Sequence, residues 1–233
     1  MLRALGSCMI FHPHRGFFTD RVQLIVEDVA NAVTHGVGLL FGIAALAILD
    51  VYAARTGDPY KIVGCTLFGI GLIMMYASSV LYHSVRKQPW KKIFKVFDHA
   101  SIYVLIAGSY SPILLVNMRP DWGWTLFGIQ WSLAFAGLFF KFFFIHRFEI
   151  FSLSIYILMG WFVILAVGPL FHYMELRGIL WLLWGGLCYT VGAFFYAWET
   201  PLFGHAIWHA FVVAGTICHF FAILFYVVQV PIH

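Results

Sequence analysis

The sequence predicts an all-α fold: a polytopic membrane protein built as a seven-transmembrane helix bundle, with the N-terminus in the cytoplasm and the C-terminus outside. Of its 233 residues, 62% are hydrophobic and only 10% are charged. A soluble domain of this length could not hide so much apolar surface from water, so lipid must surround most of the chain. The spacing of the apolar runs and the placement of the basic residues complete the prediction.

Seven apolar runs have about the 20 residues that a helix needs to cross a ~30 Å hydrocarbon layer. All seven must be helical, because lipid offers the backbone no hydrogen-bond partners. The connections between them are short, so consecutive helices should pack as antiparallel neighbours. We expect residues 1–26 to form a cytoplasmic N-terminal tail and residues 27–233 to form the transmembrane domain. The runs cover residues 31–53, 62–84, 97–117, 124–145, 150–171, 177–197 and 205–229.

The basic residues are distributed unequally between the two sides of the predicted membrane. Because Lys and Arg concentrate in cytoplasmic loops, a ratio of ten to four places the N-terminus inside. The formal charge of +4 is therefore spread over short loops, and we expect no nucleic-acid partner. The ten are Arg3, Arg15, Arg21, Arg86, Lys87, Lys91, Lys92, Lys95, Lys141 and Arg147, and the four are Arg55, Lys61, Arg119 and Arg177.

Three histidines predict a metal site. His205 and His209 are four residues apart, so they share one helix face about 6 Å apart along the axis. His83 closes the second run, and the predicted topology brings all three to the cytoplasmic ends of their helices. Three imidazoles suit Zn²⁺ and leave a fourth tetrahedral position for water. The four cysteines lack paired spacing and indicate neither a disulfide framework nor a cysteine metal site.

Two further polar residues share this predicted depth. Asp98 opens the third run, where it could hold and deprotonate a water molecule. Ser79 lies one turn before His83 and could hydrogen-bond to a ligand, to that water or to a substrate carbonyl. The alternative is that all of these are polar residues at helix ends that reach the membrane interface or one another.

A second polar group comes before and within the first run. It could orient the metal ligands from outside, or Asn31 could simply cap a helix; we favour structural support over direct ligation. His99 and His219 lie off the faces of the predicted ligands and are interpreted as packing residues or as residues of a second site. Residues 108–112, Gly-Ser-Tyr-Ser-Pro, predict close helix packing or a kink in the third run. The second group comprises Glu27, Asn31, Thr34 and His35.

Together these motifs resemble the haemolysin III branch of the progestin and adiponectin receptor (PAQR) family, which is related to alkaline ceramidases. The resemblance extends in order from about residue 24 to about residue 229. It implies a seven-helix bundle and a Zn²⁺ ion held by His83, His205 and His209, with Asp98 near the zinc-bound water and Ser79 beside it. The motifs are Glu27, Asn31, Thr34 and His35; Ser79, Tyr82 and His83; Phe97, Asp98, His99 and Ser101; and residues 205–209.

The resemblance leaves the reaction open. The first hypothesis is a zinc-dependent hydrolase of the bacterial inner (cytoplasmic) membrane, acting on an amide or ester bond of a lipid with a polar head group that enters between the helices. Relatives that include alkaline ceramidases cleave lipid amides, whereas the bacterial branch is named for haemolysis and is linked with membrane lipid homeostasis. The alternatives are therefore a pore-forming cytolysin and a non-enzymatic membrane regulator with structural zinc.

Overall fold

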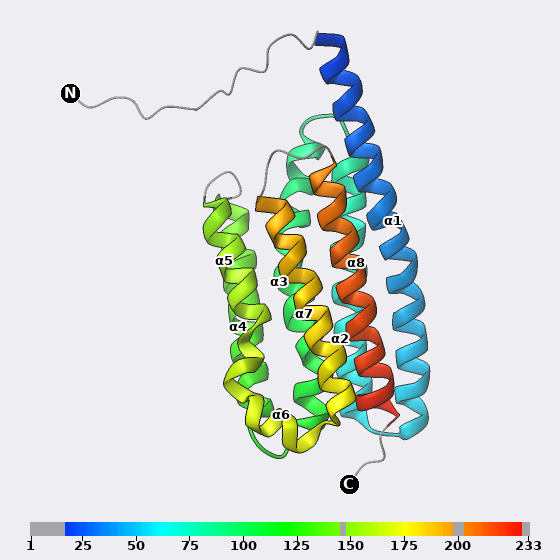
Figure 1. Cartoon of the computed structure of the whole chain (residues 1–233), viewed down its shortest axis with the longest axis vertical. Coiled ribbons are helices and arrows are strands. Elements are labelled where there is room, and N and C mark those ends of the chain that lie inside the picture. Colours follow the sequence, from blue (N-terminus) through cyan, green and yellow to red (C-terminus); the bar gives the residue numbers. More distant parts are fainter. Residues whose placement is uncertain (1–16, 145–147, 198–202, 230–233) are drawn as a thin grey trace, which may run out of the picture.

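The computed structural model describes residues 17–144, 148–197 and 203–229, and all regular structure in these ranges is helical. Seven helical segments are long and apolar enough to cross a membrane, which confirms the predicted fold class (Figure 1). The segments run over Val22–Thr56, Pro59–Ser84, Trp90–Asn117, Gly123–Phe144, Glu149–Tyr173, Leu176–Ala197 and Gly204–Val228.

Several of these segments combine more than one kind of helix. The third and the seventh end in a π-helix, and the fifth is divided into three parts. The elements are α1 (Phe17–Thr56), α2 (Pro59–Ser84), α3 (Trp90–Pro112), η1 (Ile113–Asn117), α4 (Gly123–Phe144), α5 (Glu149–Gly160), η2 (Phe162–Ala166), α6 (Val167–Tyr173), α7 (Leu176–Ala197), α8 (Gly204–Ile223) and η3 (Leu224–Val228).

Helix α1 begins well before the first predicted run. It starts at Phe17, so residues 17–26 of the predicted tail are helical; residues 1–16 lie outside the described part of the chain. The extension is explained by Val22, Leu24 and Ile25, which continue the apolar composition of the helix toward its N-terminus. In Figure 1, α1 rises beyond the ends of the other helices.

The fifth span is not the single helix that the apolar run at 150–171 predicted. Helix α5 ends at Gly160, and a 3₁₀ segment leads into α6. Interrupted backbone is tolerated within a membrane only where other groups satisfy its polar atoms. Tyr110 of α3 does so: its hydroxyl donates to the Gly160 carbonyl at 2.7 Å and accepts from the Val163 amide at 3.0 Å.

The glycine and proline segment of α3 lies against α2. A Cβ atom at Gly108 would lie 2.8 Å from the Leu67 carbonyl oxygen, and one at Gly64 would lie 2.7 Å from the Pro112 Cα atom. These distances are too short for any side chain, so the glycines let the two helices approach closely. Helix α3 continues through Pro112 and changes to a π-helix at Ile113.

Helix packing brings α1 and α2, from the N-terminal part of the chain, together with α8 from its C-terminal part. Helix α2 packs between α1 and α3, while α8 packs against both α7 and α1. Large apolar side chains cover the outer surfaces, as at Leu40, Phe139 and Leu165, where lipid would contact them. The α2–α3 connection carries the basic residues Arg86, Lys87 and those of early α3. That this end of the bundle faces the cytoplasm stays a prediction. Three of the ten basic residues on which the prediction depends, Arg3, Arg15 and Arg147, lie outside the described residues.

Candidate metal centre

His83, His205 and His209 form one cluster where α2 ends and α8 begins. Each offers one ring nitrogen, and these atoms all lie within 4.8 Å of one another. The ring centroids are 5.1 Å apart for His83 and His205, 5.3 Å for His83 and His209, and 4.5 Å for His205 and His209. His83 and His209 are buried and His205 is half-buried. This group could hold a metal ion.

The two nitrogens of each ring have different surroundings. The Nδ1 atom of His83 lies 2.9 Å from Asp28 Oδ1, and the Nδ1 atom of His209 lies 3.3 Å from the Asn31 carbonyl oxygen. Carboxylate and carbonyl oxygens only accept hydrogen bonds, so both rings donate from Nδ1 and carry a lone pair on Nε2. The Nε2 atoms of all three histidines are buried without a partner among the described residues. This donor set fits a metal ion, which binds unprotonated imidazole nitrogens whose second nitrogen is hydrogen-bonded.

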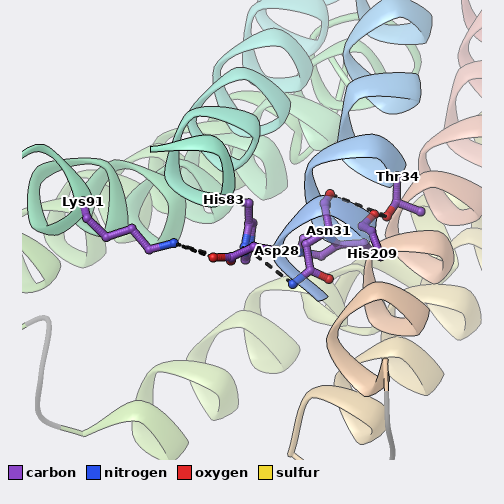
Figure 2. Close-up of polar contacts among 7 residues, drawn as sticks. Asp28, Asn31, Thr34, His83, Lys91 and His209 are labelled. Atoms are coloured by element: carbon purple, nitrogen blue, oxygen red, sulfur yellow. Dashed lines mark hydrogen bonds and ion pairs between the residues drawn. The ribbon is translucent and has the colours of Figure 1, made fainter. Parts of the chain in front are cut away.

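Helix α1 supplies the groups behind the rings. Figure 2 shows Asp28 between Lys91 and His83, with Asn31 reaching toward both His83 and His209. The Asn31 Nδ2 atom also lies 3.5 Å from His83 Nδ1. Because α1 begins at Phe17, Asn31 is in the helix interior. The alternative that Asn31 caps a helix is therefore wrong, and it supports the cluster instead.

The other members of the second polar group play unequal parts. His35 is 1% exposed and its ring stacks on His209 with centroids 3.4 Å apart, but it lies outside the converging group. The Thr34 hydroxyl donates to the Ala30 carbonyl of its own helix, and Glu27 accepts from Gln23. His35 thus packs against the centre, while Thr34 and Glu27 bond within α1.

Asp98 and Ser79 are buried on facing helices. The Ser79 hydroxyl lies beside the Asp98 carboxyl group, without the geometry of a full hydrogen bond. The next residue, Ser78, bonds to the Ser101 hydroxyl at 2.9 Å, and Ser101 donates to the Asp98 carbonyl. Asp98 does not belong to the converging ligand group. These contacts fix α2 against α3 at this level.

His99 and His219 lie outside the group of three converging histidines, in agreement with the expectation that neither is a ligand of this centre. The backbone carbonyl of His99 accepts from the Tyr156 hydroxyl at 2.8 Å. The Nε2 atom of His219 lies 3.4 Å from the Leu182 carbonyl, and its ring packs edge-on against Tyr189.

The residue missed in the sequence is Asp28. The predicted polar group included its neighbour Glu27 instead, but the hydrogen bond of Glu27 in the described structure is with Gln23 and not with a histidine. Residues 28, 31 and 35 follow the spacing of one helix face, but so do residues 27, 31 and 35. The sequence spacing therefore does not distinguish Asp28 from Glu27, and the packing of α1 places Asp28 against His83.

Comparison with known proteins identifies the family of this chain. The model of the haemolysin-III related family matches residues 23–220. The Hemolysin-3 homolog of Bacillus subtilis (strain 168) is 46% identical over 207 residues, covering 89% of this chain and 97% of the relative. Hemolysin-3 of Bacillus cereus is 44% identical over 209 residues, covering 90% and 95%.

A more distant relative is human. The monocyte to macrophage differentiation factor of Homo sapiens is 28% identical over 214 residues, covering 88% of this chain and 86% of the relative, and it links the chain distantly to the PAQR family. No solved structure matches significantly. The family model covers most of the chain and the bacterial relatives match almost end to end, so the protein belongs to the haemolysin-III related family.

Proposed function

We propose that this protein is a zinc-dependent hydrolase of the bacterial inner membrane that cleaves an amide or ester bond of a membrane lipid and thereby serves lipid homeostasis. The observation that carries the proposal is the convergence of one ring nitrogen from each of three histidines whose Nε2 atoms are all buried without a partner among the described residues. Burying one polar atom without a hydrogen bond is costly, and a ligand shared by the three rings would compensate that cost.

The chemical type of these atoms favours zinc. Three neutral imidazoles form the ligand set of several catalytic zinc sites, in which the fourth position stays open. The groups behind the rings, a carboxylate for His83 and a backbone carbonyl for His209, are those that orient zinc-binding histidines elsewhere. A structural site with four protein ligands would need one more donor, and the described residues place no fourth acid, cysteine or histidine in the group.

The proposed reaction assigns separate tasks to Asp98, Ser79 and the three histidines. A bound zinc ion would supply a Lewis acid and activate water. The Asp98 carboxylate would accept a proton from the attacking water as the water oxygen bonds to the substrate carbonyl carbon, and it would return that proton to the leaving amine or alcohol as the C–N or C–O bond breaks. The Ser79 hydroxyl, beside that carboxyl group, would hydrogen-bond to the carboxylate or to the substrate carbonyl. His83 and His209 would keep their Nδ1 protons, and none of the three histidines would transfer a proton.

The first test combines metal content with turnover. We expect one zinc ion per chain of detergent-purified protein, measured by mass spectrometry of the metal, and hydrolysis of at least one member of a panel of lipid amides and esters. His83→Ala, His205→Ala and His209→Ala should lose both metal and turnover, whereas Asp98→Ala should keep the metal and lose turnover. Absence of metal from the wild-type protein would refute the site.

His99→Ala serves as the matched control. His99 is buried next to Asp98 in the same helix but lies outside the ligand group. It should keep its zinc and at least part of its turnover. Loss of metal in this variant to the same degree as in His83→Ala would mean that any buried histidine disturbs the bundle, and the assignment of ligands would fail.

Two other functions make different predictions in the same experiment. The name of the Bacillus cereus relative, Hemolysin-3, favours a pore-forming cytolysin. For that function, dye release from lipid vesicles should survive His83→Ala. A regulator with structural zinc would bind the metal and show no turnover in either the wild-type protein or Asp98→Ala.

A further inference from the structure

Asp28 lies between the candidate metal ligand His83 and a lysine at the bundle surface (Figure 2). Its Oδ1 atom is 2.9 Å from His83 Nδ1, and its Oδ2 atom is 3.2 Å from Lys91 Nζ. The three residues come from α1, α2 and the first turn of α3. Asp28 therefore joins three helices at one carboxylate.

Lys91 is held from a second direction as well. Its ammonium nitrogen lies 4.5 Å from the centre of the Tyr82 ring, at cation–π distance, and the Tyr82 ring is 4.7 Å from that of His83. Lys91 is 22% exposed and Asp28 is 29% exposed, so the pair lies at the edge of the buried centre. A solvated ion pair at the surface contributes little to stability by itself. The Lys91–Asp28 pair, however, holds the Asp28 carboxylate against the buried His83 ring.

The three ligand rings differ at the nitrogen that faces away from the cluster. His83 donates to a carboxylate and His209 to a neutral backbone carbonyl; for His205, the structure shows no hydrogen bond at all to a described residue. A hydrogen bond to a charged acceptor is stronger and makes the other ring nitrogen a better donor to a metal. Of the three rings, His83 thus has the strongest hydrogen bond at the nitrogen that faces away from the cluster.

We infer that Asp28, held in place by Lys91, is a positioning residue that makes His83 the anchoring ligand of the metal centre. The carboxylate fixes the His83 ring with its proton on Nδ1 and its lone pair on Nε2, directed at the other two imidazoles. Lys91 fixes the carboxylate. The inference rests on the proposed metal site but not on the proposed hydrolysis.

The test measures zinc affinity of the detergent-purified protein by competition with a chromophoric chelator. Asp28→Asn should weaken binding by about 10- to 100-fold, the usual effect of losing a group behind a ligand, and Asp28→Glu should recover part of the loss. The matched control is Glu27→Gln, which removes the neighbouring acid from the same helix turn and should bind zinc like the wild-type protein. Equal affinity of Asp28→Asn and the wild type would overturn the inference and leave the metal site intact.

A double-mutant cycle tests the part assigned to Lys91. Lys91→Gln should change zinc affinity when Asp28 is present and should have no effect in the Asp28→Asn background, because it acts only through that carboxylate. An equal effect in both backgrounds would overturn this part of the inference. The metal-free protein offers an independent readout: ¹⁵N chemical shifts of its histidine rings should show the His83 proton on Nδ1 in the wild type and a mixture of tautomers in Asp28→Asn. Failure of the wild type to bind zinc would instead refute the proposed site.

Discussion

Two polar regions lie within the bundle, and they satisfy their buried atoms in opposite ways. Around the candidate metal centre, three histidine rings converge, and their Nε2 atoms are buried without partners among the described residues. Deeper between α2, α7 and α8, the Thr216 hydroxyl donates to the Val212 carbonyl and accepts from the hydroxyls of Tyr76 and Tyr189, at 2.9, 2.8 and 3.1 Å. The first region leaves buried nitrogens that a metal ion could bind, whereas the hydroxyls of the second region hydrogen-bond to one another and join three helices.

The largest difference between the regions should appear in metal affinity. His209→Ala removes a converging ligand and should weaken zinc binding by more than the roughly 100-fold upper end of effects from groups behind a ligand. Tyr76→Phe, in the second region, should leave zinc affinity within about twofold of the wild type. Chelator competition measures both. A similar loss in the two variants would remove the distinction between ligand-binding and structural polar groups.

Removal of the metal should destabilise only the first region. A ligand present at 100 times its dissociation constant adds about 2.7 kcal/mol to folding stability, so chelation should lower the thermal unfolding temperature of the wild-type protein. His83→Ala should unfold at a temperature that chelator does not change. Fluorescence-monitored unfolding in detergent makes the comparison. A chelator effect of the same size in both proteins would contradict the assigned centre.

A substitution in the second region should change the stability of the protein but not its zinc content. Thr216→Val keeps the side-chain shape and leaves the hydroxyls of Tyr76 and Tyr189 without their common acceptor. We expect a loss of about 1–3 kcal/mol in the free energy of unfolding with zinc content unchanged. Denaturant titration in detergent and metal analysis check the two halves of this prediction. Zinc loss in Thr216→Val would mean that the regions act as one.

The smallest effect distinguishes two adjacent glycines of α7. A Cβ atom at Gly185 would overlap the His219 ring and lie 3.1 Å from the Gly215 carbonyl oxygen, whereas one at Gly186 would meet nothing closer than 3.8 Å, at the Trp161 ring. Gly185→Ala should therefore cost about 1–2 kcal/mol through overpacking. Gly186→Ala should remain within about 0.5 kcal/mol of the wild type. Equal unfolding free energies for the two variants would contradict the close contact between α7 and α8.

Lipid as the solvent made the fold predictable from sequence. Apolar runs separated by charged residues indicate membrane helices directly, because no other structure satisfies the backbone there, and the structure confirms seven spans. The break after Gly160 was not predictable, since it depends on Tyr110 from another helix to satisfy the exposed backbone groups. Apolarity alone shows that a segment is buried in lipid but does not show that its helix is continuous.

The candidate site was predictable to a different extent. The four-residue spacing of His205 and His209 is visible in the sequence, and the topology placed His83 at the same level. The stacking of His35 on His209 and the contact of Asp28 with His83 depend on how α1 is rotated against α2 and α8. A single sequence does not contain that rotation. The roles of Asp98 and Ser79 in a reaction stay predictions.

The lengths of the helices determine where a lipid would meet the centre. From His35 to the end of α1 at Thr56, and from His209 to the end of η3 at Val228, the helical rise spans roughly 30 Å, which is the thickness of the hydrocarbon layer. With the far ends of these helices at the opposite edge of that layer, the histidines would lie at the level where acyl chains join their head groups. A lipid could reach them by lateral diffusion within its own leaflet, so encounter would depend on its mole fraction in the bilayer and not on its concentration in water.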